Sequence, residues 1–136
     1  MNKGIRYILA ILLGVVAVLT TQFLLTKLWN LAGISWGPNN LPFELPQKVG
    51  MLFSAFIAGV IGPGIAVIIA KRKALIIIIA FLLIGLSIDI YASIIPLKPV
   101  ALWFRIAWVI SVPIQVYFGV KLGGLFIKNN NVQQCV

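Results

Sequence analysis

Long apolar runs, separated by short basic or proline-containing segments, make up most of this chain. A helix needs about 20 apolar residues to cross the roughly 30 Å hydrocarbon core of a bilayer. Four runs reach that length, at about residues 5–28, 49–70, 74–95 and 100–127. The pattern therefore predicts an all-α polytopic membrane protein. We expect a single four-helix transmembrane bundle over residues 1–128, with an outer loop at residues 29–48 and a polar, flexible tail at residues 129–136.

The composition agrees with lipid as the surrounding solvent. Hydrophobic residues make up 62% of the 136 residues and charged residues only 10%, with a mean hydropathy of +1.12. Soluble domains have about 25% charged residues. The net charge of +9 would suit a nucleic-acid-binding protein, but the basic residues stand at the ends of the apolar runs rather than in one stripe. We therefore expect the lipid bilayer as a partner, and no nucleic acid.

The positions of lysine and arginine predict the orientation of the helices. With the N-terminus inside, the inner side carries seven basic residues: Lys3, Arg6, Lys71, Arg72, Lys73, Lys121 and Lys128. The outer side then carries three: Lys27, Lys48 and Lys98. Because basic residues concentrate on the cytoplasmic side, we predict a multi-pass protein of the bacterial cytoplasmic (inner) membrane with both termini inside.

The outer loop contains a proline at every fourth position, at Pro38, Pro42 and Pro46. Proline lacks a backbone N–H, so this spacing disfavours a regular helix. The loop also holds Trp36 and Phe43, whose apolar rings favour contact with the rest of the protein. We expect a compact cap on the outer surface.

Asp89 is one of two acidic residues in the chain and lies inside the third apolar run. A turn centred on Leu97 separates the third and fourth runs, and Asp89 and Arg105 lie at equal distances before and after it. In an antiparallel hairpin, equal distances from the turn give equal depth. A charge inside the bilayer costs at least about 2.5–3.5 kcal/mol on insertion scales. We therefore expect Asp89 and Arg105 to meet as an ion pair.

Other polar residues fall near the same depth. Counting about 1.5 Å per residue from the basic ends places Gln22, Asp89 and Arg105 roughly 24 Å from the inner boundary, with Ser54 close to that height. Two interpretations of this polar layer are open. The side chains fasten helices to one another, or they form a small polar site open to the periplasm.

Small residues recur every fourth position in the second and fourth runs. Such rows let helices approach closely where lipid gives no hydrophobic drive. The candidate packing residues are Ser54, Ala58, Gly59, Gly62, Pro63, Gly119 and Gly123. We also expect the second helix to kink or loosen at Gly62–Pro63–Gly64.

The chain offers no constellation for catalysis. It has no histidine, one cysteine (Cys135) and two carboxylates, of which Glu44 lies in the loop and Asp89 within a span. These residues supply no zinc ligand set, and no nucleotide-binding fingerprint is present. We predict no catalytic residues, no metal site and no cofactor, and therefore no enzyme.

The segments AFIAGVIGPGIAVIIAKRK and PVALWFRIAWVISVPIQVYFGVKLGG resemble a broad group of small, uncharacterised bacterial four-helix membrane proteins. The resemblance covers most of the chain and implies the four-helix architecture, but no function. The hairpin DIYASIIPLKPVALWFRIAWVISVPIQ is also similar to the last hairpin of the DoxX-like family, another small four-helix group. The glutamate of a DoxX-like second span is absent here, where Gly62 and Pro63 stand, which argues against a redox-linked role.

Abundant packing surface beside an absence of chemistry favours a non-enzymatic accessory or interaction subunit. Its partners would be other membrane protein subunits or copies of itself. The alternative is a small transporter or channel component, in which Gln22, Asp89 and Arg105 line a path or a ligand site.

Overall fold

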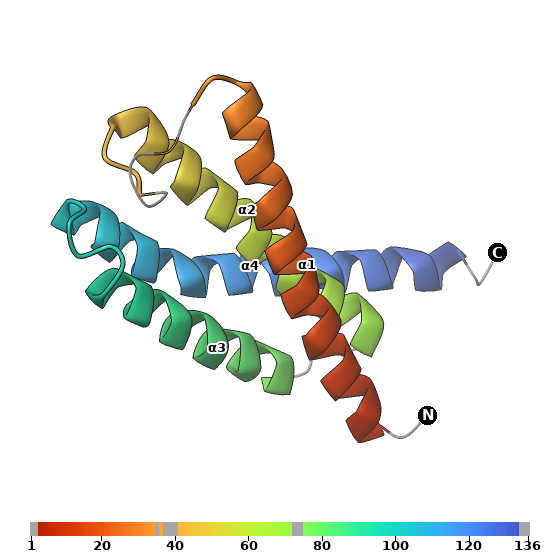
Figure 1. Cartoon of the computed structure of the whole chain (residues 1–136). Coiled ribbons are helices and arrows are strands. Elements are labelled where there is room, and N and C mark those ends of the chain that lie inside the picture. Colours follow the sequence, from red (N-terminus) through yellow and green to blue (C-terminus); the bar gives the residue numbers. More distant parts are fainter. Residues whose placement is uncertain (1–2, 35, 37–40, 72–74, 134–136) are drawn as a thin grey trace.

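The computed structural model describes residues 3–34, 36, 41–71 and 75–133 of the chain. These residues form four α-helices and no strand (Figure 1): α1 Lys3–Leu31, α2 Leu45–Ala70, α3 Leu75–Ile94 and α4 Leu102–Gln133. Each of the four helices is long and apolar enough to cross a membrane. The predicted all-α fold with four helices of spanning length is therefore confirmed.

The start of α2 differs from the prediction, because the helix begins earlier, at Leu45, and includes Pro46. Proline is tolerated in the first turn of a helix, where the backbone N–H has no intrahelical acceptor. Oε1 of Gln47 accepts hydrogen bonds from the backbone N–H groups of Phe43 (2.9 Å) and Glu44 (3.1 Å), which fixes the start of the helix. The prediction that the proline spacing disfavours a regular helix in this loop thus fails at Pro46, which lies in the first turn of α2.

The structure describes part of the predicted outer loop and part of the predicted tail. α4 continues to Gln133, through most of the segment expected to be a polar, flexible tail, and residues 134–136 lie outside the described residues. The cap expected over residues 29–48 also falls partly outside them, at residues 35 and 37–40. In the described part of this loop, Leu41 packs against the buried cluster of Leu97, Val100, Phe104 and Trp108.

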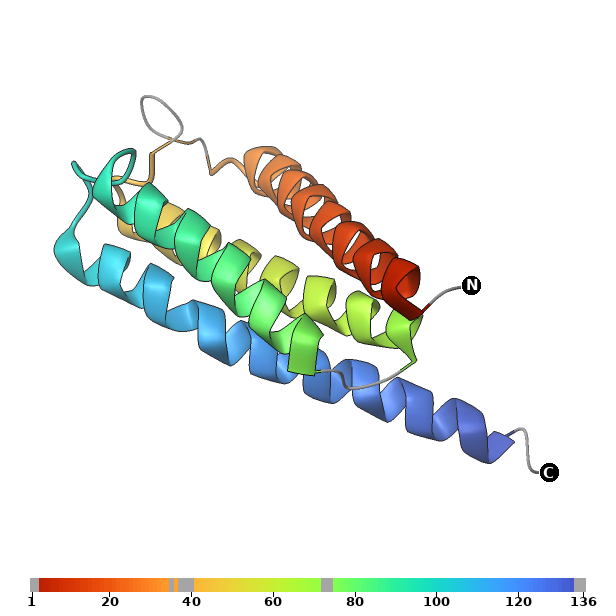
Figure 2. The same ribbon diagram turned by 90° about the horizontal axis from the view of Figure 1, so that it is seen from below.

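The four helices alternate in direction. Both chain termini lie at one end of the bundle, here called the terminal end, and the α1–α2 loop and the α3–α4 turn lie at the other, the loop end (Figures 1 and 2). α2 packs along α1 on one side and along α4 on the other, whereas α3 packs mainly against α4. Within the described residues α1 makes only limited contact with α3 and does not pack against α4. α2 is therefore the central helix.

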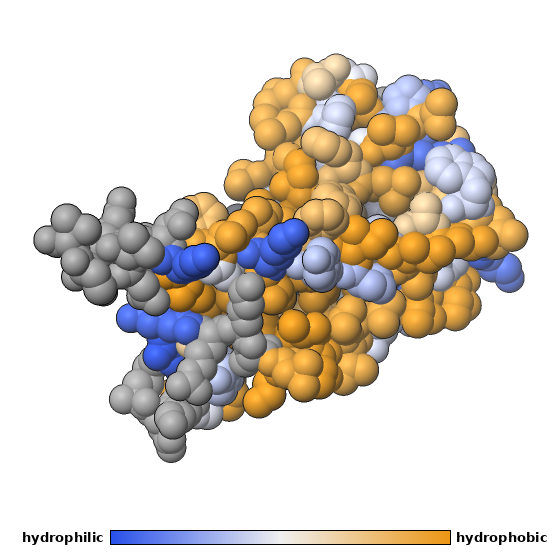
Figure 3. Space-filling model, turned by 180° about the vertical axis from the view of Figure 1, so that it is seen from behind, coloured by the Kyte–Doolittle hydropathy of each residue, from blue (hydrophilic) through white to orange (hydrophobic). Residues whose placement is uncertain are grey.

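Large apolar side chains cover the outward surfaces of the helices. Figure 3 shows one face of the molecule, most of which is apolar, with hydrophilic residues toward its ends. Leu12 and Phe23 of α1, Leu83 of α3 and Ile110 of α4 are among the exposed large hydrophobic residues. A continuous apolar surface of this extent is unusual for a protein surrounded by water.

Glycines allow α2 to approach both of its main neighbours closely. A Cβ on Gly62 would lie 2.9 Å from the carbonyl oxygen of Gly14 in α1, and a Cβ on Gly123 of α4 would lie 2.6 Å from the carbonyl oxygen of Gly64. Larger residues at these positions would force the helices apart. α2 also continues through Pro63, which is buried, past the point where a kink or loosening is expected.

Buried apolar residues form two clusters. One includes Ala66, Val67, Ile77, Phe81, Val112 and Val116. The other lies toward the loop end and consists of Leu97, Val100, Phe104 and Trp108. A cavity bordered by Phe81 and Val116 of the first cluster and by Trp108 of the second separates them.

Candidate functional site

The cavity between the two clusters has a volume of about 280 Å³ and is lined by all four helices. We call it the Asp89 pocket. α2 forms its floor with small residues, Ala55, Ala58 and Gly59, together with Pro63. Because these residues have little or no side chain, they leave space between α1, α3 and α4 that a larger residue would fill.

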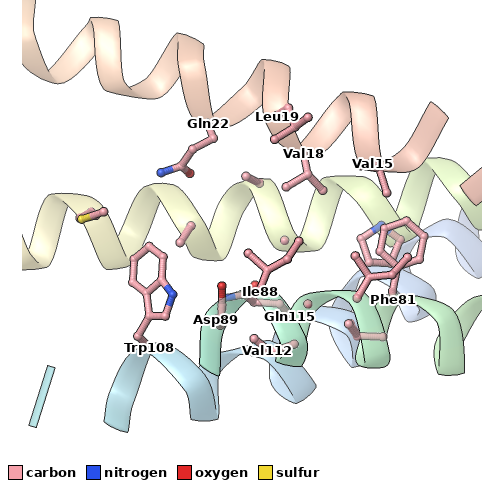
Figure 4. Close-up of a pocket in the computed structure, with 18 residues that line it drawn as sticks. Val15, Val18, Leu19, Gln22, Phe81, Ile88, Asp89, Trp108, Val112 and Gln115 are labelled. Carbon is pink, nitrogen blue, oxygen red and sulfur yellow. The ribbon is translucent and has the colours of Figure 1, made fainter. Parts of the chain in front are cut away.

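Three helices direct polar side chains into this mostly apolar pocket (Figure 4). Gln22 comes from α1, Asp89 from α3, and Trp108 and Gln115 from α4. The indole nitrogen of Trp108 points toward the carboxylate of Asp89. The Nε1–H of Trp108 faces this carboxylate without reaching standard hydrogen-bond geometry, and the buried Oε1 of Gln22 has no hydrogen-bond partner in the described part of the chain. Buried polar atoms are normally hydrogen-bonded, so unpartnered ones facing a cavity point to a ligand or to water.

Gln115 is held in place by its own helix and by a glycine opposite it. Its Nε2 donates to Oγ of Ser111 at 2.6 Å, and that hydroxyl donates to the carbonyl of Trp108 at 2.7 Å. A Cβ on Gly59 would overlap the Gln115 side chain, so only glycine at this position lets Gln115 lie against α2. Pro63, four residues further along α2, has no N–H to donate to the Gly59 carbonyl. Gly59, a residue of the pocket floor, therefore has a carbonyl that lacks its usual helical donor.

The expected ion pair between Asp89 and Arg105 does not form. Among the described residues no ion pair within 4.0 Å joins them, and Nη1 of Arg105 instead donates to the backbone carbonyl of Ser93 at 3.2 Å. Arg105 lines a second, separate cavity with Ile106 and Ile110, whereas Asp89 lines the Asp89 pocket. Equal depth in the hairpin was a necessary condition for pairing, but the two side chains leave the hairpin on different faces.

Ser54, the fourth member of the predicted polar layer, has a contact of its own. Its hydroxyl accepts a hydrogen bond from Nε1 of Trp29 at 2.7 Å and donates one to the carbonyl of Gly50 at 2.8 Å. The Trp29 ring covers Gly50, where an added Cβ would lie 3.3 Å from it. Ser54 does not line the Asp89 pocket. It fastens the end of α1 to the start of α2.

The other small residues singled out in the sequence are placed between helices of this chain. Ala58, Gly62 and Pro63 are buried in α2, and Gly119 and Gly123 are buried in α4. A Cβ on Gly119 would overlap the carbonyl oxygen of Val60, so α4 and α2 touch backbone to backbone here. These residues are thus used within the bundle.

Sequence reasoning did not single out Trp108 or Gln115 as site residues. Each residue nevertheless has a sequence feature that marks it. Tryptophan in a membrane helix favours the interface, and Trp108 lies five residues deeper than Trp103, about 7.5 Å along a helix. Gln115 is a polar residue within a spanning segment, like Gln22. Within the described ranges no three His, Cys, Asp or Glu residues lie close enough to hold a metal ion.

The polar groups of the Asp89 pocket include both hydrogen-bond acceptors and donors. The Asp89 carboxylate and Oε1 of Gln22 accept, whereas Nε2 of Gln22 and Nε1 of Trp108, which faces Asp89, donate. No lysine or arginine is among the residues that line it. Among the residues that line the pocket, no nucleophile is paired with a base.

Comparison with known proteins adds no relative: no family model, curated protein or solved structure matches this chain. The two family resemblances in the sequence therefore remain expectations from the sequence alone.

Proposed function

We propose that this chain is a non-enzymatic, multi-pass protein of the bacterial cytoplasmic membrane that binds a small molecule in the Asp89 pocket, as a small transporter component does. The observation that carries the proposal is the cavity of about 280 Å³ that residues of all four helices line. Within it, the buried Oε1 of Gln22 has no partner among the described residues, and Nε1 of Trp108 faces Asp89 without standard hydrogen-bond geometry. Polar groups inside a membrane are costly, and contact with a ligand offsets that cost.

The distribution of charge supports membrane insertion with both termini inside. Arg6 and Lys71 lie at the terminal end, where Nε of Arg6 donates to the carbonyl of Ile69 at 2.9 Å. The predicted inner residues Arg72 and Lys73 lie outside the described residues. With Lys121 and Lys128 of α4, Arg6 and Lys71 outnumber the described basic residues toward the loop end, which are Lys27, Lys48 and Lys98. This excess agrees with the positive-inside rule.

The accessory-subunit hypothesis is less well supported by the geometry. That hypothesis requires the rows of small residues to be free for contact with another protein. Gly62 packs against α1, and Gly119 and Gly123 pack against α2, so these rows serve contacts within the chain. Association with other subunits or with a second copy stays a prediction from the sequence.

A pocket-filling variant tests the proposal. Ala55→Leu adds three carbon atoms to the floor of the Asp89 pocket, and Val16→Leu places the same new side chain at an exposed position of α1 that does not line the pocket. Purified protein in detergent is screened with amphipathic small molecules, and stabilisation is measured as a rise in Tm. We expect compounds that stabilise the wild type and Val16→Leu but not Ala55→Leu. If every stabilising compound acts equally on all three proteins, the pocket is not a binding site.

A further inference from the structure

We propose that the ligand of the Asp89 pocket is an amphipathic organic cation, an ammonium group attached to a compact apolar body, which reaches the pocket from the bilayer between α1 and α3. This inference rests on the proposed function and names the class of molecule bound. It follows from the charge, the shape and the opening of the pocket.

The charge of the pocket selects a cation. Asp89 is its acidic residue, and the nearest candidate counter-ion in the sequence, Arg105, is bound to Ser93 on a different face of the hairpin. A carboxylate without a cationic partner is costly in a low-dielectric interior, and a bound cation lowers that cost. An anion would instead be repelled by Asp89.

The uncharged polar groups agree with this choice. Oε1 of Gln22 is a buried acceptor without a donor among the described residues, and it lines the same pocket as the Asp89 carboxylate. Acceptors of this kind are matched by the N–H groups or polarised C–H groups of an ammonium ion. Trp108, which is 9% exposed, borders the same space with an aromatic ring that attracts cations.

The rest of the lining matches an apolar body. Val15, Val18, Phe81, Val112 and Val116 all line the pocket. Polar groups are few and lie toward the Gln22, Asp89 and Trp108 side, as Figure 4 shows. A ligand with one charged end and one apolar end therefore has a complementary surface for each.

The pocket opens between α1 and α3. Leu19 of α1 and Ile88 of α3 line it although they are 65% and 59% exposed. Nearer the terminal end these two helices meet, because a Cβ on Gly14 would lie only 2.6 Å from the Phe81 ring. In a membrane-embedded bundle, the exposed parts of Leu19 and Ile88 face lipid. A molecule dissolved in the bilayer can therefore reach Asp89 without crossing the loops.

Two probes of the same shape test the inference: phenyltrimethylammonium, which is a cation, and tert-butylbenzene, its neutral isostere. Binding is measured by the rise in Tm with ligand concentration for the wild type, Asp89→Asn and Arg105→Gln. Arg105→Gln is the matched control, because it removes the other intramembrane charge without touching the Asp89 pocket. We expect the wild type and Arg105→Gln to bind the cation about tenfold or more tightly than the neutral isostere, and Asp89→Asn to lose that preference.

The outcomes separate the two proposals. Equal binding of both probes by the wild type, abolished in Ala55→Leu, would overturn the cation inference and leave the pocket as a binding site. Binding of neither probe, together with no stabilising compound in the wider screen, would overturn both. Loss of cation preference in Arg105→Gln but not in Asp89→Asn would place the site in the other cavity and overturn the inference. If Asp89→Asn does not fold, Gln22→Leu, which removes an acceptor of the same pocket, must weaken cation binding more than binding of the isostere.

Discussion

Arg105 and Asp89 lie in the same helical hairpin but line different cavities. The guanidinium of Arg105 is bound to the backbone carbonyl of Ser93 at 3.2 Å, while the carboxylate of Asp89 faces the indole of Trp108 inside the bundle. The opposite charges of the hairpin are thus kept apart. Asp89 remains available for a ligand, and Arg105 ties the end of α3 to the start of α4.

The separation of these charges predicts additive effects on stability. Residues that share no contact couple by less than about 0.5 kcal/mol in a double-mutant cycle, whereas contacting charges couple by more. We expect the free energy of unfolding of Asp89→Asn/Arg105→Gln to equal the sum of the single effects within that limit. The measurement is reversible unfolding in mixed detergent micelles, followed by helical circular dichroism. A coupling above about 1 kcal/mol would restore the ion pair that the sequence suggested.

Gly62 determines how closely α1 and α2 approach. A Cβ at this position would overlap Val18 and lie 2.9 Å from the carbonyl oxygen of Gly14. Overpacking of this kind costs about 1–3 kcal/mol, so we expect Gly62→Ala to lower the free energy of unfolding by that amount. Gly4→Ala is the control, because nothing lies within 4 Å of its Cβ. If both variants behave alike, close packing at Gly62 does not stabilise the bundle.

Ser54 connects α1 to α2 through the indole of Trp29. Ser54→Ala would leave the Trp29 N–H without its acceptor, and we expect a loss of about 1 kcal/mol in the free energy of unfolding. Trp29 fluorescence should also change, since the environment of its ring depends on this contact. Ser93→Ala provides the comparison, because the Ser93 hydroxyl bonds only within its own helix, to the Ile90 carbonyl. A Ser54→Ala variant as stable as wild type would show that the hydrogen bond does not hold the helices together.

The sequence was sufficient for the number and approximate place of the helices, because each span must bury about 20 residues in lipid and must satisfy its own backbone hydrogen bonds. Depth could also be counted along the helices, and the structure brings Gln22 and Asp89 to one pocket as their positions suggested. The rotation of each helix about its axis could not be counted in this way. A change of one residue turns a side chain by about 100°, and lipid-facing and core-facing residues are both apolar here. The sequence pattern therefore could not show that Arg105 and Asp89 leave the hairpin on different faces.

The small-residue rows have the same ambiguity. Gly119 and Gly123 are typical of a close helix–helix contact, but the row does not say whether the partner is in the same chain. In the structure both glycines are buried against α2, so the partner helix belongs to the same chain. The start of α2 at Leu45 was missed for another reason, because proline excludes helix only after the first turn.

Orientation in the membrane is tested by labelling single cysteines in intact bacteria. On a Cys135→Ser background, Lys71→Cys lies at the terminal end, after α2, and Lys98→Cys lies in the turn between α3 and α4. A membrane-impermeant maleimide should label Lys98→Cys in intact cells, and Lys71→Cys only after the membrane is opened. The reverse pattern would place both termini outside. Equal labelling of the two sites in intact cells would contradict membrane insertion itself.

Leu19 lines the Asp89 pocket at the opening between α1 and α3, so a bulky group attached to it should occupy part of the pocket and compete with a ligand. On the Cys135→Ser background, Leu19→Cys modified with a benzyl thiosulfonate reagent should bind phenyltrimethylammonium about tenfold more weakly than the unmodified variant, a change of about 1.4 kcal/mol in binding free energy. Leu24→Cys is the matched control, because Leu24 is 55% exposed on the same helix and does not line the pocket. The thermal-shift titration used for the wild type measures both. Equal weakening at Leu19 and Leu24 would indicate a general effect of modification, and no weakening at Leu19 would mean that the ligand does not occupy the part of the pocket beside Leu19.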